Sequence, residues 1–145
     1  MIGIKNLTTS KVDESFIRKI VEFVLKKEKK EGEVSIVLVG QNKIRKINKF
    51  YRGKNRATDV LSFRKDEVKG EFFLPEGIQE LGEILLCLRE IKKRAKRENS
   101  TFERELARSL IHGVLHLLGY THQEEEKAKI MREKEEEYLK FLIPT

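Results

Sequence analysis

Hydrophobic and polar positions follow one another in short blocks that predict strands and amphipathic helices in alternation. The run from Val34 to Val39 consists almost entirely of β-branched residues and Leu, as expected for a strand that is covered on both faces or lies centrally in a sheet. Strands of similar character are predicted at 2–6, 60–63 and 81–88. Apolar residues at helical spacing predict helices at 16–25, 42–50, 89–97, 102–118 and 124–141.

Polar residues and glycines mark where several of these helices should begin and end. Gly32 is expected to end the first helix, and Asn42 to cap the start of the second. Ser100, with Glu103 three residues later, matches a capping box at the start of the long helix at 102–118. Gly119 stands where a glycine with positive φ should terminate that helix.

Two stretches without a clear period are expected to lie outside the regular elements. Residues 51–57 are polar and basic and are interpreted as a loop, whereas residues 65–77 contain glycines and a proline that favour a hairpin or an exposed excursion. No repeat, linker or change of composition divides the chain. The pattern therefore predicts a single α+β domain over residues 1–145, with helices packed on a small sheet.

Length and composition narrow the class of protein. The chain has 145 residues, which suits one domain, and no apolar run approaches the roughly 20 residues of a bilayer span. Its start is too polar for a signal peptide, so a cytoplasmic location without membrane association is expected. Cys87 is the only cysteine, which excludes an intramolecular disulfide and Cys-based zinc sites, and it is expected to lie in the core.

All three histidines of the chain fall within residues 112–122. His112 and His116 are four residues apart and point to one helix face, separated by about 40° around the axis. Gly119 then permits a tight turn that can bring His122 back toward them. Three neutral imidazoles with one open position are typical of a catalytic zinc site, so Zn²⁺ is the expected metal, with nickel and cobalt as the alternatives that three histidines also suit. Two ordinary histidines and an incidental third are the alternative interpretation.

The histidine spacing matches that of the metzincin proteases, with one difference that bears on the chemistry. Position 113 is Gly, where those proteases carry the glutamate that acts as general base toward the zinc-bound water. Peptide hydrolysis depends strongly on that residue. The spacing therefore predicts a hydrolytic metal site whose substrate tolerates a different proton acceptor.

Charge is distributed unevenly along the chain, whose formal net charge is +7. No acidic residue occurs from Val34 to Thr58, and this part contains a basic segment, residues 43–56, that suits contact with nucleic-acid phosphates. A second basic cluster at 89–97 is equally compatible with a solvated surface, and acidic residues concentrate at 124–137. The bases expected to bind RNA are Lys43, Arg45, Lys46, Lys49, Lys54 and Arg56.

Several stretches of the sequence resemble motifs of the YbeY family of bacterial rRNA maturation factors. The resemblance rests on His112-Gly-Val-Leu-His-Leu-Leu-Gly-Tyr-Thr-His122, Asn48-Lys-Phe-Tyr-Arg-Gly-Lys54 and Thr58-Asp-Val-Leu-Ser-Phe63. Leu81-Gly-Glu-Ile84 is similar to a fourth block of the family. Together they span the chain from about residue 34 to residue 122.

The resemblance implies a metal-dependent endoribonuclease specific for single strands, acting in 3′-end maturation of small-subunit rRNA and in ribosome quality control. It implies zinc binding by His112, His116 and His122 and a functional role for Arg52. It also implies a small mixed sheet with helices packed on it and a zincin-like metal site at the end of a long helix. Single-stranded rRNA and the small ribosomal subunit are the implied partners.

The sequence departs from the family pattern at a few positions. Thr121 stands where an Asp usually precedes the third histidine, which leaves the hydrogen-bond partner of His122 open. Ala57 and Arg64 replace prolines, and Glu83 replaces an Asp.

Two further carboxylates, Glu105 and Asp59, are candidates for contact with the site. Glu105 lies seven residues before His112, on nearly the same helix face, and is expected to be a surface residue rather than a partner of the metal ligands. Asp59 begins an apolar strand and is expected to cap or orient a neighbour, with a general-base role as the alternative.

Three functions of different classes remain at this point. The favoured one is an endoribonuclease in which Arg52 stabilises the charge of the phosphorane. The second is a metallopeptidase, which Gly113 disfavours. The third is a ribosome-binding assembly factor whose metal is structural, a role that requires a closed, four-ligand site.

Overall fold

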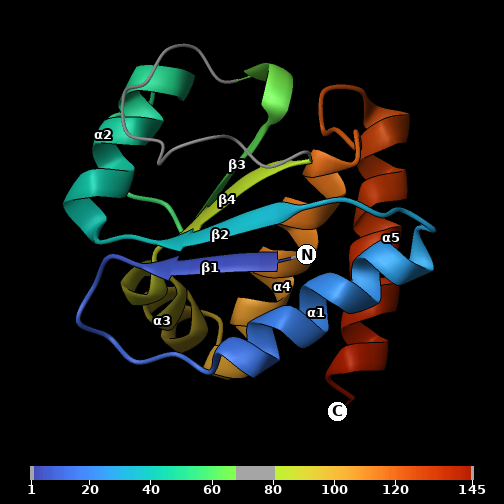
Figure 1. Cartoon of the computed structure of the whole chain (residues 1–145), viewed down its shortest axis with the longest axis horizontal. Helices are drawn as coiled ribbons and strands as arrows, with labels where there is room; N and C mark the ends of the chain where they lie inside the picture. Colours follow the sequence, from blue (N-terminus) through green and yellow to red (C-terminus); the bar gives the residue numbers. More distant parts are fainter. Residues whose placement is uncertain (1, 68–80, 145) are drawn as a thin grey trace.

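The computed structural model describes residues 2–67 and 81–144, which form a four-stranded sheet and five helices (Figure 1). The strands are β1 (Ile2–Asn6), β2 (Val34–Leu38), β3 (Val60–Arg64) and β4 (Gly82–Leu86). The helices are α1 (Glu14–Lys27), α2 (Gln41–Arg52), α3 (Leu88–Arg97), α4 (Phe102–Leu117) and α5 (Glu125–Leu142), with a 3₁₀ turn, η1 (Lys65–Glu67), after β3.

The sheet is mixed, with strand order β1-β2-β4-β3. β1, β2 and β4 run parallel, and β3 pairs antiparallel with β4 at one edge. Every residue of β2 is buried, as its unbroken apolar run predicts for a central strand. The predicted α+β class and small mixed sheet are confirmed.

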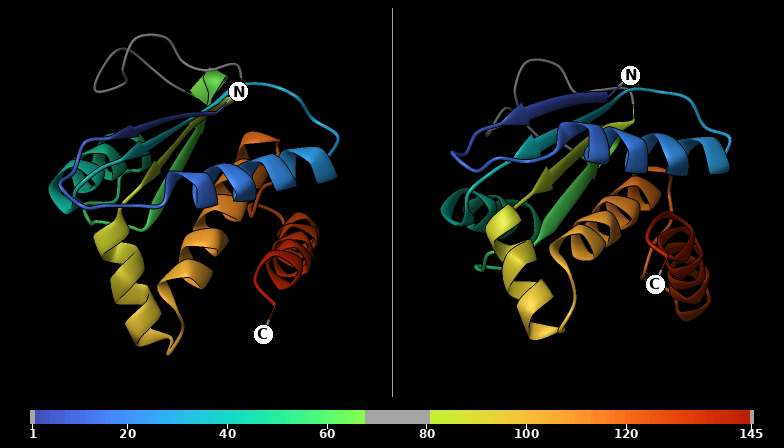
Figure 2. Two further views of the ribbon diagram at one scale, coloured as in Figure 1. Left: turned by 60° about the horizontal axis from the view of Figure 1, so that its bottom comes forward. Right: turned by 90° about the horizontal axis from the view of Figure 1, so that it is seen from below.

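Side chains alternate between the two faces of the sheet, so each strand contributes to two separate apolar clusters. Ile36 and Ile84 pair on the face that packs against α1 and α4. Val37 and Leu85 pair on the opposite face and pack with Phe63 beneath α2. Figure 2 shows α1, α3, α4 and α5 gathered on one side of the sheet. The long helix α4 thus lies between the sheet and α5, with the histidine motif at its carboxyl end.

Two predicted helix boundaries are wrong for local reasons. α1 ends at Lys27, before Gly32, because Glu28 already has the terminal geometry and Lys29 adopts a positive φ of 55°. α2 begins at Gln41 after the extended residue Gly40, so Asn42 lies inside the helix and does not cap it.

The capping residue of α4 lies one residue later than predicted. Thr101 is the capping residue, and its hydroxyl accepts a hydrogen bond from the backbone N–H of Arg104. Ser100 instead donates to the carboxylate of Glu105 at 2.8 Å. At the other end, Gly119 has a φ of 102°, which confirms the predicted glycine terminator.

The interpretation of residues 51–57 as a loop is partly wrong. α2 continues through Arg52 and closes on Gly53, which has a φ of 71°. Arg52 is therefore held at the end of a helix and not in a loop. Of the predicted excursion at 65–77, residues 65–67 form η1 and the rest lies outside the described residues.

The remaining structural expectations have different outcomes. Cys87 is completely buried, as predicted. Glu105, expected at the surface, is 3% exposed because Arg94 and Arg108 of α3 and α4 pair with its carboxylate. Asp59 orients neighbours, since it accepts hydrogen bonds from Arg94 at 2.7 Å and Ser109 at 3.0 Å. None of the described helices is long and apolar enough to cross a membrane.

Candidate functional site

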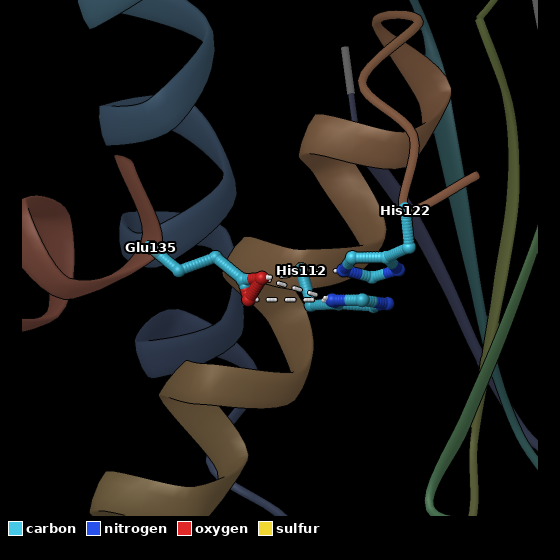
Figure 3. A group of neighbouring side chains, drawn as sticks. All are labelled: His112, His122 and Glu135. Carbon is cyan, nitrogen blue, oxygen red and sulfur yellow. Dashed lines mark hydrogen bonds and ion pairs between the residues drawn. The ribbon is translucent and has the colours of Figure 1, made fainter. Parts of the chain in front are cut away.

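The turn after α4 brings the first and last histidines of the motif together, as the glycine at position 119 predicts. The rings of His112 and His122 stack with their centroids 4.8 Å apart and an interplanar angle of 16°. Figure 3 shows both imidazoles in this stacked arrangement, one from the helix and the other from the turn. Residues ten apart in the sequence therefore share one site.

Glu135, from the middle of α5, completes this group (Figure 3). Its carboxylate lies 3.2 Å from Nδ1 of His112 and 4.0 Å from Nε2 of His122. One potential ligand atom from each of the three residues lies within 4.8 Å of the others. We call these three residues the His–Glu cluster.

His116 lies one helical turn beyond His112 and interacts with a different carboxylate. Its Nε2 is 3.0 Å from Oε1 of Glu67, which is the last residue of η1. The structure thus groups two of the three predicted imidazoles directly and pairs the third with Glu67. The three-histidine ligand set stays a prediction.

Electrostatics favours the neutral, metal-binding form of two imidazoles. Burial lowers the pKa of His116, and the nearby Arg64 and Arg52 lower it further, against the opposing effect of Glu67. Burial and the neighbouring His112 lower the pKa of His122. Neither ring has to lose a proton at neutral pH before it can bind a cation.

Glu67 connects the histidines to Arg52. Its Oε2 pairs with the Arg52 guanidinium at 3.4 Å, while its Oε1 accepts from the backbone N–H of Arg64 at 2.8 Å. Burial by itself raises the pKa of Glu67, but the Arg64 N–H and the His116 ring hold it below its usual value. A single carboxylate therefore bridges His116 and Arg52.

Arg52 is fixed by contacts on three sides. Besides the ion pair with Glu67, it donates to the backbone carbonyl of Ser62 at 3.1 Å. Its guanidinium carbon lies 4.7 Å from the centroid of the Phe63 ring. The end of α2 thus presents this cation beside β3 and η1, close to His116.

The basic segment covers α2 and the residues that follow it. Arg45 is half-buried and donates to Asn55 at 2.8 Å. The other bases expected to contact RNA are exposed, namely Lys43, Lys46, Lys49, Lys54 and Arg56. Their exposure leaves them accessible to a polyanion, and their role in binding stays a prediction.

Sequence reasoning missed the carboxylates of the site. Glu135 lies within an acidic run whose other members give no pattern that separates it from a solvated surface. Glu67 follows a recognised strand block but is separated from His116 by 49 residues. Pairings of this length have no local signal in a single sequence.

Comparison with known proteins decides the family. The family model described as Endoribonuclease YbeY matches residues 4–143. The chain belongs to the YbeY family. It is 42% identical to the Endoribonuclease YbeY of Clostridium botulinum (strain Loch Maree / Type A3), with 90% of each chain covered. It is 40% identical to that of Thermoanaerobacter sp. (strain X514), covering 87% of this chain and 85% of the relative.

A solved structure supports the same assignment. The solution structure of TM1509 from Thermotoga maritima superposes with a TM-score of 0.65 at 32% identity, covering 98% of this chain and 89% of that one. The YbeY family is metal-dependent, and the donors found here fit a metal. Imidazole nitrogens together with carboxylate oxygens are the ligands that zinc and similar divalent ions take in proteins.

The YbeY pattern has an Asp before the third histidine, whereas this chain has Thr121. The Thr121 hydroxyl accepts a hydrogen bond from the backbone N–H of Gln123 at 3.1 Å and so stabilises the turn. Glu135 is the carboxylate that faces His122 in this chain. It comes from another element, which the sequence comparison alone does not indicate.

Proposed function

We propose that this protein is a metal-dependent endoribonuclease that cleaves single-stranded RNA during maturation of the small-subunit rRNA 3′ end. Its membership of a family of endoribonucleases supports the nuclease activity. The observation that carries the residue assignment is the bridge from His116 through Glu67 to Arg52. It brings a guanidinium that can bind phosphate next to ligands that can bind a metal.

His112, His116 and His122 are assigned as the ligands, with Zn²⁺ as the metal. When bound, such an ion acts as a Lewis acid on a phosphoryl oxygen and makes water more acidic. Nδ1–H of His112 donates to Glu135, which leaves Nε2 of that ring available and fixes its orientation. Glu135 is therefore assigned to positioning the first and third ligands.

Arg52 is assigned to the phosphate itself. A planar guanidinium can donate two parallel hydrogen bonds to the oxygens of a phosphoryl group, and it remains charged at every physiological pH. The contacts to Ser62 and Phe63 fix it before substrate arrives, so no reorganisation is needed as negative charge develops.

A metallopeptidase is disfavoured by position 113 in the structure as well as in the sequence. A Cβ atom at Gly113 would lie 3.1 Å from two carbon atoms of the Ile84 side chain on β4. Position 113 therefore faces the sheet, and a glutamate there would be directed into the core instead of the histidines.

The activity is tested by cleavage of a labelled single-stranded RNA that contains a small-subunit rRNA 3′ end, with the matching duplex as comparison. We expect the zinc-loaded protein to cut the single strand, and the chelator-treated protein and the His116→Ala variant to lose activity. Lys129→Ala, on the exposed face of α5, serves as control. Undiminished cleavage by the metal-free protein would contradict the proposal.

The same protein preparations distinguish the nuclease from the third function, an assembly factor with a structural metal. Such a protein would bind the small ribosomal subunit equally well as wild type and as Arg52→Ala, and neither form would cleave RNA. Loss of cleavage with retained subunit binding in the variant alone supports the nuclease.

A further inference from the structure

One aromatic residue of α2 is directed toward solvent. Phe50 is 57% exposed, whereas the helix buries Ile44 and Ile47 against the sheet. It lies four residues after Lys46 and seven after Lys43, so the three side chains share one exposed side of the helix. An exposed aromatic ring among cations offers a π face directly beside positive charge.

Ring contacts connect Phe50 to the functional arginine. The Phe50 and Tyr51 rings meet edge to face with their centroids 4.8 Å apart, and Tyr51 lies 5.0 Å from Phe63. The Phe63 ring in turn lies beneath the Arg52 guanidinium. A continuous aromatic path therefore runs from an exposed ring to the group assigned to the phosphate.

The surroundings select the kind of molecule that can cover this ring. The chain has no acidic residue between positions 34 and 58, so α2 offers cations without built-in counter-charges. Exposed lysines together with an aromatic face are the combination that binds a phosphate backbone and stacks a base. A base within a duplex has both faces covered by its neighbours and cannot stack in this way.

We propose that Phe50 stacks on an unpaired base of the same RNA strand that places a phosphate at Arg52, and that this contact contributes the preference for single strands. The inference rests on the proposed function and adds to it the residue that distinguishes paired from unpaired RNA. Lys43 and Lys46 hold the adjoining backbone, and the ring then samples only bases that are free to leave a helix.

The experiment uses the absence of tryptophan from the chain. Phe50→Trp introduces a single tryptophan reporter, whose emission is recorded in a stopped-flow instrument before cleavage. We expect quenching when single-stranded RNA binds and no quenching with the same sequence as a duplex. Phe141→Trp, at an aromatic residue of α5 that is 67% exposed, is the matched control and should not respond.

Affinity provides the second measurement. Anisotropy of a labelled single-stranded oligonucleotide should show affinity reduced about tenfold for both Phe50→Ala and Phe50→Leu, because neither has a π face. Phe50→Tyr should retain the parental value. Parental affinity in Phe50→Leu, or unchanged emission of the tryptophan variant while RNA binds, would overturn this inference and leave the nuclease assignment intact. If the parent binds no RNA at all, both fail.

Discussion

At the residue scale, Arg52 is the side chain whose chemical identity matters most for the proposed reaction. A lysine at this position would keep the charge but could not donate two parallel hydrogen bonds or stack on Phe63 in the same way. We therefore expect Arg52→Lys and Arg52→Ala both to lower the cleavage rate about 10²–10³-fold. Single-turnover cleavage with the RNA fully bound measures this directly.

Retained RNA binding by the Arg52 variants would distinguish a role in the reaction from simple electrostatic attraction of the RNA. Both Arg52 variants should keep their metal, measured by elemental analysis, and most of their RNA affinity. Parental cleavage by Arg52→Lys, or a loss of affinity in Arg52→Ala that matches its loss of rate, would assign the residue to the binding surface instead.

Glu28 lies outside the site but is in contact with both segments that shape it. Its carboxylate accepts hydrogen bonds from Tyr120 at 2.7 Å, from Lys134 at 3.2 Å and from Tyr138. These donors hold its pKa below the usual value although burial opposes them. Tyr120 precedes His122 by two residues, and Lys134 adjoins Glu135. One acid at the end of α1 therefore fixes the turn and α5 together.

We expect Glu28→Gln to lose about 2 kcal/mol of unfolding free energy, because a neutral amide accepts these hydrogen bonds less strongly. Zinc affinity should fall roughly tenfold as His122 and Glu135 lose their relative position. Glu22→Gln, at an exposed position of α1, is the control. Denaturation in urea and zinc competition with a chelating dye provide the two measurements. Parental zinc affinity in Glu28→Gln would limit Glu28 to a role in stability.

Glu83 links stability to pH. It is fully buried on β4, and burial raises its pKa to about 7, against the opposing effect of the Ser35 hydroxyl. Between pH 4.5 and 7 the unfolded chain therefore releases a proton that the folded protein keeps. Any stabilisation from this group is complete below pH 4.5 and is lost as the pH rises through 7.

We accordingly expect Glu83→Gln to change how the free energy of unfolding varies with pH, and not only its value at one pH. From pH 4.5 to pH 8 the parent should lose up to about 3 kcal/mol relative to the variant. Urea denaturation of both proteins at several pH values measures the difference. Parallel stability curves would show that Glu83 ionises as easily in the folded protein as in the unfolded chain.

At the scale of the element, α2 has two functional borders beside its buried face. Arg52 lies on one and Phe50 on the other, with exposed lysines between them. If these lysines contact phosphates, RNA binding must weaken with salt in proportion to the counterions released. On that expectation α2 serves as an electrostatic surface for RNA, with Arg52 at its carboxyl end.

Replacing Lys46 and Lys49 by Ala should make the slope of log affinity against log salt shallower by about 0.7–1 for each lost contact. The pair Lys127→Ala and Lys129→Ala removes the same charge from α5 and should affect the slope much less. Titrations between low and physiological salt determine both slopes. An unchanged slope in the α2 variant would place the RNA elsewhere, with α3 as the next basic surface.

Elements were predictable from the sequence wherever their signal is local. The apolar run of β2, the helical period of α4 and the glycine at 119 each gave the correct structure. Boundaries failed where a neighbouring residue competed, as when Thr101 and not Ser100 capped α4. A capping residue and its neighbour offer similar hydrogen bonds, so sequence alone rarely selects between them.

The approach of His122 to His112 was predictable from the sequence, whereas the carboxylates beside the histidines were not. The spacing of residues 112–122 defines a turn without reference to the rest of the chain. Glu67 and Glu135 reach that turn only through the packing of η1 and α5, and Glu28 through the end of α1. Local periodicity carries no information about such distant partners.

At the scale of the whole molecule, charge is arranged asymmetrically. The basic helix α2 and the acidic helix α5 lie on opposite sides of the fold (Figure 1). The His–Glu cluster belongs to the acidic side, whereas Arg52 belongs to the basic side. If an RNA strand is attracted to α2, the first histidine that it approaches is His116, which Glu67 joins to Arg52.

The same arrangement makes the metal a link between separate elements. Glu135 of α5 contacts His112 of α4 and His122 of the following turn, so if these histidines bind an ion, it should stabilise the native packing of all three segments. At a free zinc concentration of about 100 Kd the gain is about 2.7 kcal/mol, which raises Tm by several degrees. Chelation should remove this gain without unfolding the sheet.

The gain should also depend on pH in a defined direction. Ligating imidazoles must be neutral, and burial lowers the pKa of both His116 and His122 below its ordinary value of 6.5. Zinc should therefore stabilise fully at neutral pH and begin to lose its effect only below about pH 6, as protons start to compete for the rings. Calorimetry with and without zinc at pH 5 and pH 7.5 tests this, with the His112→Ala/His116→Ala protein as the form that should gain nothing. Full zinc occupancy in that double variant, or an undiminished gain at pH 5, would show that the ion binds through other groups.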